Sequence, residues 1–262
     1  MSAPPKLVGV IHLPALPGSP RASHSMAALR DMVRADARAL RDAGYDAIVV
    51  ENFGDIPFFA GAVPPITVAA MTVCAQVVRD EAKDAFLCIN VLRNDAAAAL
   101  SIAAATAAQA VRINVHTGAR VTDQGIVVGQ AAETLRLRAA LGCTDVRIWA
   151  DVAVKHSAPL GERPLEQEVE DTVLRAMANA VLVTGDGTGK KTDPAKLARV
   201  RACAKGAPVL VASGASLDSL PELAKVCDGV IVGSALRPGG IAGGPIDAGL
   251  AESFARAFRK AF

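Results

Sequence analysis

The feature that most constrains the fold of this chain is a regular alternation of eight short apolar runs with eight longer stretches of helical pattern. The runs are rich in Val, Ile and Leu, a content typical of parallel strands buried on both faces. The chain has 262 residues and no shift in composition between units. We therefore predict one (β/α)8 barrel domain over residues 1–262. A doubly wound sheet is disfavoured because no G-x-G-x-x-G follows the first run.

Predicted strands and helices alternate along the whole sequence. The strands are expected at 7–13, 47–52, 86–92, 111–115, 146–152, 180–184, 209–213 and 230–234. The helices are expected at 26–43, 65–82, 95–108, 129–141, 165–178, 193–205, 216–226 and 247–260. Gly44, Gly142 and Gly206 stand just past three of these helices, where glycine commonly ends a helix.

Polar residues gather where the predicted strands end, and this is the face of a barrel that carries chemistry. We predict a catalytic set of Asp151, Glu51, His12, Lys155 and His156. The predicted substrate-binding set is Asn52, Asn90, Arg112, Asn114, His116 and Asp123. Because side chains alternate along a strand, only one of Glu51 and Asn52 can point straight into the barrel.

Two of these residues have competing interpretations. Arg112 lies mid-strand, where a buried guanidinium needs a carboxylate such as Glu51 or Asp151; it forms either a structural ion pair or a contact to a substrate anion. Lys155 lies beyond a strand, in a loop. This favours a phosphate contact or a surface charge over a Schiff-base nucleophile.

Two segments near the end of the chain share one design, a β-branched run that stops at small residues: Pro208–Gly214 and Gly229–Ser234. The amides after the last two strands of a barrel frequently bind phosphate. Thr184–Gly189, followed by two lysines, looks like an anion-binding loop, with a flexible connection as the alternative. We predict a phosphate site made of Thr184, Gly185, Thr188, Gly189, Ser213, Gly214, Gly233 and Ser234.

Two further segments concern the pocket wall and the surface. Phe53, Phe58 and Phe59 follow the second strand and either wall a pocket or fill a subunit contact. Residues 65–78 and 96–108 contain no charged side chain, although an outer barrel helix normally keeps a polar stripe. These two helices predict a homo-oligomer contact, with a merely alanine-rich surface as the alternative.

Composition argues against several classes of partner. The net charge is +2, from 28 basic and 26 acidic residues without a basic run, which argues against nucleic acid. The longest apolar stretches are too short to span a membrane. Five scattered cysteines without a C-x-x-C pair indicate a reducing, cytoplasmic location. His12 and His116 lack metal-site spacing, so we predict neither a metal nor another cofactor.

Several stretches together resemble the BtpA/SgcQ family over nearly the whole chain. They are Gly9–Pro20, Val50–Asp55, Ile89–Asp95, Arg112–Gly118, Thr122–Gly125, Ala150–His156 and Thr184–Gly189. The resemblance implies a barrel of the ribulose-phosphate-binding type. It also implies two incompatible roles, a factor that stabilises photosystem I and an enzyme of sugar or nucleoside metabolism.

The polar residues at the ends of the predicted strands favour the enzyme over the assembly factor. We expect a phosphorylated sugar or nucleoside-type substrate and acid/base chemistry at the sugar, either glycosidic cleavage or isomerisation. The alternative is a non-catalytic photosystem I biogenesis factor peripheral to the membrane, for which the uncharged helices would form the docking face.

Overall fold

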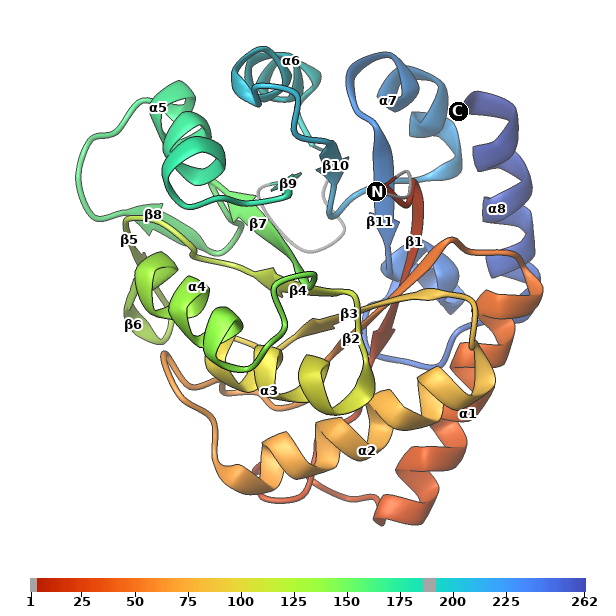
Figure 1. Cartoon of the computed structure of the whole chain (residues 1–262). Coiled ribbons are helices and arrows are strands. Elements are labelled where there is room, and N and C mark those ends of the chain that lie inside the picture. Colours follow the sequence, from red (N-terminus) through yellow and green to blue (C-terminus); the bar gives the residue numbers. More distant parts are fainter. Residues whose placement is uncertain (1–3, 186–191) are drawn as a thin grey trace.

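Eight parallel strands close into a barrel in the computed structural model, which describes residues 4–185 and 192–262 (Figure 1). The strands are β1 (Leu7–His12), β2 (Ala47–Glu51), β3 (Phe86–Asn90), β4 (Ala110–Ile113), β7 (Arg147–Val152), β9 (Ala180–Val183), β10 (Val209–Val211) and β11 (Gly229–Val232). Each of these eight strands pairs with the barrel strands before and after it in chain order, and β1 pairs with β11 to complete the ring. The predicted barrel is thus confirmed.

Helices surround the barrel and alternate with its strands (Figure 1). They are α1 (Met26–Asp42), α2 (Pro65–Glu81), α3 (Ala96–Thr106), α4 (Ala131–Ala140), α5 (Leu165–Glu170), α6 (Pro194–Cys203), α7 (Leu220–Val226) and α8 (Ala248–Ala261). A π-helical turn, Asp171–Arg175, extends α5, and a 3-10 turn, Leu217–Ser219, precedes α7. Gly44, Gly142 and Gly206 adopt φ of +73°, +67° and +87°, as expected for residues that end helices. No helix within the described ranges has the length and apolar content needed to cross a membrane.

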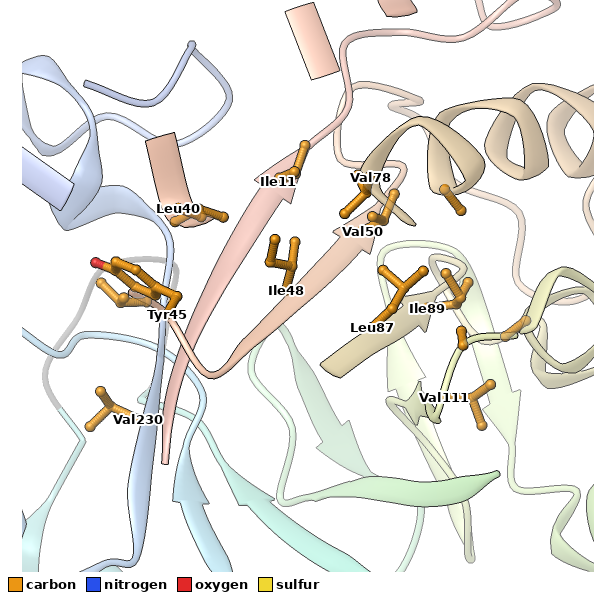
Figure 2. Close-up of a cluster of buried hydrophobic side chains, with 14 of the residues drawn as sticks. Ile11, Leu40, Tyr45, Ile48, Val50, Val78, Leu87, Ile89, Val111 and Val230 are labelled. Atoms are coloured by element: carbon orange, nitrogen blue, oxygen red, sulfur yellow. The ribbon is translucent and has the colours of Figure 1, made fainter. Parts of the chain in front are cut away.

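Each barrel strand divides its side chains between two cores, because successive residues point to opposite faces. Figure 2 shows the outer core, where strand residues such as Ile48, Val50 and Leu87 lie with Leu40 of α1 and Val78 of α2. The alternate residues, including Val49 and Cys88, fill the barrel interior. Both faces are apolar, which explains the near-continuous hydrophobic runs in the sequence.

Aromatic side chains fill the barrel toward the amino-terminal ends of its strands. The rings of Phe86 and Trp149 stack 5.5 Å apart with an interplanar angle of 2°. The guanidinium carbon of Arg147 lies 5.4 Å from the centre of the Phe86 ring. With this end filled, the inward-facing polar residues lie toward the carboxyl ends.

A small antiparallel sheet interrupts the barrel pattern and differs from the sequence prediction. Its strands are β5 (Ala119–Thr122), β6 (Gly125–Val128) and β8 (Ser157–Pro159), in the order β6-β5-β8. The sequence analysis assigned neither a strand nor a helix to these short segments. The pairing of β5 with β8 joins residues more than thirty positions apart, and a local pattern cannot reveal such pairing. This sheet anchors the chain that leaves β7.

Candidate active site

Five polar side chains form a ring inside the barrel at its mouth: His12, Glu51, Asn90, Arg112 and Asp151. Ala47 and Val49 belong to the barrel interior, so Glu51, two residues further on, also points inward. Asn52 points to the other side, where its side-chain oxygen accepts a hydrogen bond from the amide of Leu92 at 2.7 Å. The sequence therefore left open a choice that the strand register decides in favour of Glu51.

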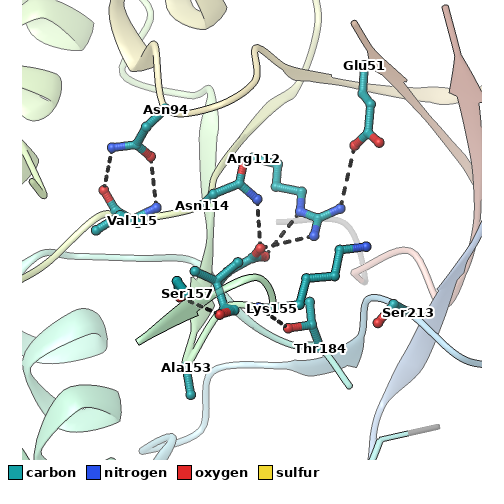
Figure 3. Close-up of polar contacts among 12 residues, drawn as sticks. Glu51, Asn94, Arg112, Asn114, Val115, Ala153, Lys155, Ser157, Thr184 and Ser213 are labelled. Carbon is teal, nitrogen blue, oxygen red and sulfur yellow. Dashed lines mark hydrogen bonds and ion pairs between the residues drawn. The ribbon is translucent and has the colours of Figure 1, made fainter. Parts of the chain in front are cut away.

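A bidentate ion pair between Arg112 and Asp151 lies at the centre of this ring. Nε and Nη2 of Arg112 donate to Oδ1 and Oδ2 of Asp151 at 3.1 and 3.0 Å. Asn114 Nδ2 donates to the same Oδ2 at 2.7 Å. Nη1 of Arg112 lies 3.8 Å from Oε2 of Glu51, and Figure 3 shows the guanidinium extended toward that carboxylate.

The charges around Arg112 determine its ionisation. Burial disfavours the charged guanidinium, but the facing carboxylates of Asp151 and Glu51 outweigh burial and raise the pKa of Arg112. Arg112 is therefore a permanent cation beneath the mouth. The structural ion pair is present, and the same guanidinium also lines both cavities described below.

His12 is held as a neutral imidazole. The amide of Gly243 donates to Nδ1 at 3.2 Å, which places the proton on Nε2, 3.5 Å from Oε1 of Glu51. The ring stacks on Phe53 with centroids 4.3 Å apart. Burial, followed by the charges of Arg237, Lys155 and Arg112, lowers the pKa of His12 well below 6.5. The neutral imidazole therefore directs its Nε2–H toward Glu51 and can donate a hydrogen bond while remaining uncharged.

A cavity of about 240 Å³ opens beside these groups and reaches the last two strands. Ser213 and Gly214 after β10 line it together with Gly233 and Ser234 after β11. A side chain at Gly233 would approach the His12 ring to 2.9 Å, so glycine is needed for this close packing. The two small-residue strand ends do meet at one cavity, next to Glu51 and His12.

A second cavity, of about 470 Å³, adjoins the first and shares Glu51, Phe53, Arg112 and Lys155 with it. Its other lining residues are Ile56, Phe58, Leu92, Arg93, Asn114, Asp123 and His156. Phe53 and Phe58 thus form walls, whereas the Phe59 side chain is 54% exposed and lines neither cavity in the described structure. Asp123 lies 3.8 Å from Arg93 at the rim.

The remaining predicted site residues do not all line the two cavities. His116 is buried away from the cavities, with Nε2 3.0 Å from the carbonyl oxygen of Ala176. Thr184 accepts a hydrogen bond from the amide of Lys155 at 2.9 Å, and Gly185 donates to Ser213 at 3.1 Å. Thr188 and Gly189 lie outside the described residues. Within residues 4–185 and 192–262, no cluster of three or more His, Cys, Asp or Glu side chains could hold a metal ion.

Sequence reasoning missed Arg237, whose side chain is 1% exposed. Its guanidinium donates to the carbonyl oxygens of Gly233 at 2.7 Å, Val10 at 3.1 Å and Gly244 at 2.6 Å. These bonds tie the end of β11 to β1 and to the loop before α8. An arginine three residues after Ser234 was a visible signal, but the sequence did not reveal its carbonyl partners.

Comparisons with known proteins agree with the fold. The model of the family described as "BtpA family" matches residues 4–260. An uncharacterized protein of Thermococcus kodakarensis is 44% identical over 234 residues, covering 89% of this chain and 87% of its own. The photosystem I biogenesis protein BtpA of Synechocystis is 42% identical over 231 residues, covering 88% and 80%. The solved phosphoribosyl anthranilate isomerase of Thermus thermophilus covers 97% of this chain and 98% of its own, with a TM-score of 0.59 and 11% identity.

The Arg112–Asp151 pair predicts a large, non-additive effect on stability. Asp151→Leu should lower the free energy of unfolding by about 3–5 kcal/mol, because it leaves a buried guanidinium without its bidentate partner. Adding Arg112→Met should recover part of that loss, since the uncompensated charge is then removed. Urea denaturation of the two single variants and the double variant measures the coupling. Additive losses would contradict a coupled buried pair.

The neutral state of His12 predicts a pH dependence of stability. Its folded pKa lies below 6.5, so between the two values only the unfolded chain binds the proton. The free energy of unfolding should therefore fall as pH decreases below about 6.5, by up to about 1.4 kcal/mol per pH unit for this group. His12→Gln should flatten that slope in urea titrations from pH 7.5 to 5.5. An unchanged slope would show that His12 is not held neutral.

Proposed function

The chain belongs to the BtpA family, and on this basis we propose that it is an enzyme acting on a phosphorylated sugar or nucleoside-type small molecule. The reaction is acid/base chemistry at the sugar, either glycosidic cleavage or isomerisation. One observation carries the proposal: the small-residue ends of β10 and β11 share a cavity with Glu51, His12 and Arg112. An anion site and titratable groups thus face one ligand.

The end of the cavity formed by β10 and β11 suits a phosphate group. Gly214 adopts φ of +75°, a conformation that glycine reaches without a steric penalty. Small side chains allow backbone amides to approach a ligand, and Arg112 contributes positive charge to the same cavity. A neighbour of the same fold is named for a phosphoribosyl substrate, which supports the same ligand class here.

Glu51 is the best-placed acid/base group. Its carboxylate lines both cavities and lies within 4 Å of His12 and Arg112. Asp151 has a different part in the proposal, because Arg112 and Asn114 occupy both of its oxygens. We therefore assign proton transfer to Glu51 with His12, and assign Asp151 to holding Arg112 in place.

Asn114 offers a hydrogen-bonding group for a sugar hydroxyl, whereas the predicted substrate-binding residue Asn90 lines neither cavity of the described structure. Neither the oxygen nor the nitrogen of the Asn90 amide has a partner among the described residues, although its side chain is fully buried. The Asn114 oxygen is likewise without a partner in the described structure, and Asn114 lines the second cavity. Buried amides are costly unless they are hydrogen-bonded, so a hydroxyl-bearing ligand in the second cavity would satisfy the Asn114 oxygen.

The second candidate function is a non-catalytic role in photosystem I biogenesis. It is favoured by the name of the Synechocystis relative and by the exposed apolar side chains of α2, where Ile66 and Val73 are 48% and 41% exposed. The same face is our proposed homo-oligomer contact. An assembly factor needs no ordered set of titratable groups at the mouth, so the Glu51–His12–Arg112 arrangement favours the enzyme.

A charge change at the proposed anion site tests ligand binding. Sugar phosphates and nucleotides should raise the melting temperature of the wild-type protein by mass action, and their non-phosphorylated counterparts should not. Ser234→Asp places a carboxylate in the cavity and should weaken binding by about tenfold or more, equivalent to about 1.4 kcal/mol. Ser23→Asp, at an exposed site, introduces the same charge and should leave the shift intact. Equal shifts in both variants would refute the phosphate site.

Glu51→Gln tests the acid/base assignment. Once the screen identifies a ligand that is turned over, we expect kcat to fall by about 100-fold or more, because the amide cannot transfer the proton. The ligand-induced thermal shift should persist, since the anion site remains intact. Steady-state kinetics and thermal shift on one preparation distinguish these effects. Full turnover by Glu51→Gln would remove Glu51 from the mechanism.

A further inference from the structure

The chain that leaves β7 turns back across the mouth instead of leading away from it. Ala153 and His156 adopt positive φ of 44° and 57°, a conformation that residues with a Cβ adopt at a cost of roughly 1–3 kcal/mol each. Lys155 lies between them. Sequence analysis placed this lysine in the catalytic set and in a loop beyond the strand, and favoured a phosphate contact or a surface charge; in the structure its side chain lines both cavities.

Side chains from several elements hold this turn in place. The amide of Ala153 donates to Glu168 of α5 at 2.9 Å, and the carbonyl oxygen of Ala153 accepts from Lys196 of α6 at 3.3 Å. The amide of Lys155 donates to Thr184 at 2.9 Å. Contacts at Ala153 and Lys155 thus fix a strained segment, as expected where a side chain must be presented in one orientation.

Ser157 adds a connection to the small antiparallel sheet. Its hydroxyl donates to the carbonyl oxygen of Val154 at 2.6 Å and accepts from Nε of Arg120 in β5 at 2.6 Å. The same Arg120 lies 3.6 Å from Glu168, which binds Ala153. The sheet that sequence analysis did not anticipate therefore supports the turn that carries Lys155.

The Lys155 amine is partly buried without a polar partner in the part of the chain that the structure describes. Within the described residues, Nζ has neither a hydrogen-bond partner nor a carboxylate within ion-pair distance, although the side chain is half-buried. Burial, followed by the nearby charge of Arg112, lowers the pKa of Lys155, and Glu51 and Asp151 offset this in part. A larger share of the amine is therefore neutral and nucleophilic than in a surface lysine.

The position of Lys155 relates it to the proposed phosphate site. Ser213, Gly214, Gly233 and Ser234 line the first cavity alone, whereas Lys155 and Glu51 line both cavities. A ligand whose phosphate lies against β10 and β11 would extend past the amine toward the second cavity. The amine would then face carbon atoms of the ligand and not the phosphate.

We propose that Lys155 Nζ is a nucleophile that forms an imine with the substrate, which is accordingly a phosphorylated aldehyde or ketone. This inference rests on the proposed function and selects isomerisation over glycosidic cleavage. The neutral amine adds to the carbonyl carbon, and the C=O π electrons move to oxygen, which takes up a proton. After nitrogen loses a proton, the carbinolamine expels its hydroxyl as water with a proton supplied by Glu51, leaving an iminium ion. Water reverses these steps and restores the amine.

The iminium ion explains why Glu51 lines the same cavities. A positive nitrogen withdraws electrons and acidifies the neighbouring C–H bond, so the Glu51 carboxylate can remove that proton and leave a neutral enamine. Return of the proton to the other face of the same carbon regenerates the iminium ion with that carbon inverted, and water then releases the isomerised substrate and the free amine. No oxidant or reductant is consumed in this sequence.

Borohydride trapping with pyridoxal 5′-phosphate tests the inference, since this probe carries both an aldehyde and a phosphate. With the full chain, reduction should attach one probe per molecule, and peptide mapping should place it on Lys155. Pyridoxal, which lacks the phosphate, should label at least about tenfold less. Inorganic phosphate should compete. Dihydroxyacetone phosphate and ribose 5-phosphate should be trapped at the same residue.

Two matched variants complete the experiment. Lys155→Arg keeps the positive charge but cannot form an imine, so it should lose the label while retaining phosphate-dependent thermal stabilisation. Lys225→Met removes an exposed lysine of α7 that pairs with Glu222 and should be labelled as the wild type is. Circular dichroism verifies that both variants are folded.

The outcomes separate the two proposals. If phosphorylated ligands stabilise the protein but the label falls on surface lysines and not on Lys155, the imine is refuted and the proposed phosphate-binding function stands. If pyridoxal and pyridoxal 5′-phosphate label Lys155 equally and no phosphorylated ligand stabilises the protein, the phosphorylated ligand class and the proposed function both fail.

Discussion

The buried ion pair between Arg112 and Asp151 is the interaction on which the mouth of this barrel depends. It neutralises a guanidinium that could not otherwise remain inside the barrel, and both oxygens of Asp151 are occupied as a result. The cation it retains lies beside Glu51 and contributes to the lowered pKa values of His12 and Lys155. The two carboxylates of the ring therefore differ: both oxygens of Asp151 are hydrogen-bonded within the protein, whereas Glu51 lines both cavities.

This arrangement divides the mouth into regions with different chemistry. The strand ends after β10 and β11 present small residues, while Phe53 and Phe58 provide apolar walls on the other side. Glu51, Arg112 and Lys155 lie where the two cavities join. A ligand with a phosphate at one end and a reacting carbon near its middle matches that order. The curated relatives include both an uncharacterized archaeal protein and one named for photosystem I biogenesis, so the geometry of the mouth carries more of the functional argument than any relative's name.

Much of the fold was predictable because barrel strands and outer helices each leave a local pattern. Strand alternation also limited the choice between Glu51 and Asn52, and the cost of burying a guanidinium was enough to identify Asp151 and Glu51 as the partners of Arg112. The paths of loops were not predictable. The β5–β6–β8 sheet, the return of Lys155 into the mouth and the three carbonyl partners of Arg237 all depend on contacts between residues far apart in the chain.

The sequence by itself determined the eight-fold alternation, the acidic and basic residues at the strand ends and the two small-residue strand ends, because each follows from a local pattern of neighbouring residues. The tertiary structure alone decided which groups face the ligand space. Closing the barrel placed Asp151 against Arg112 and left Glu51 at the cavities, while the strained turn after β7 brought Lys155 to the junction between them. The physical reason is that burial, charge proximity and hydrogen-bond competition depend on three-dimensional distance, which a linear pattern does not contain.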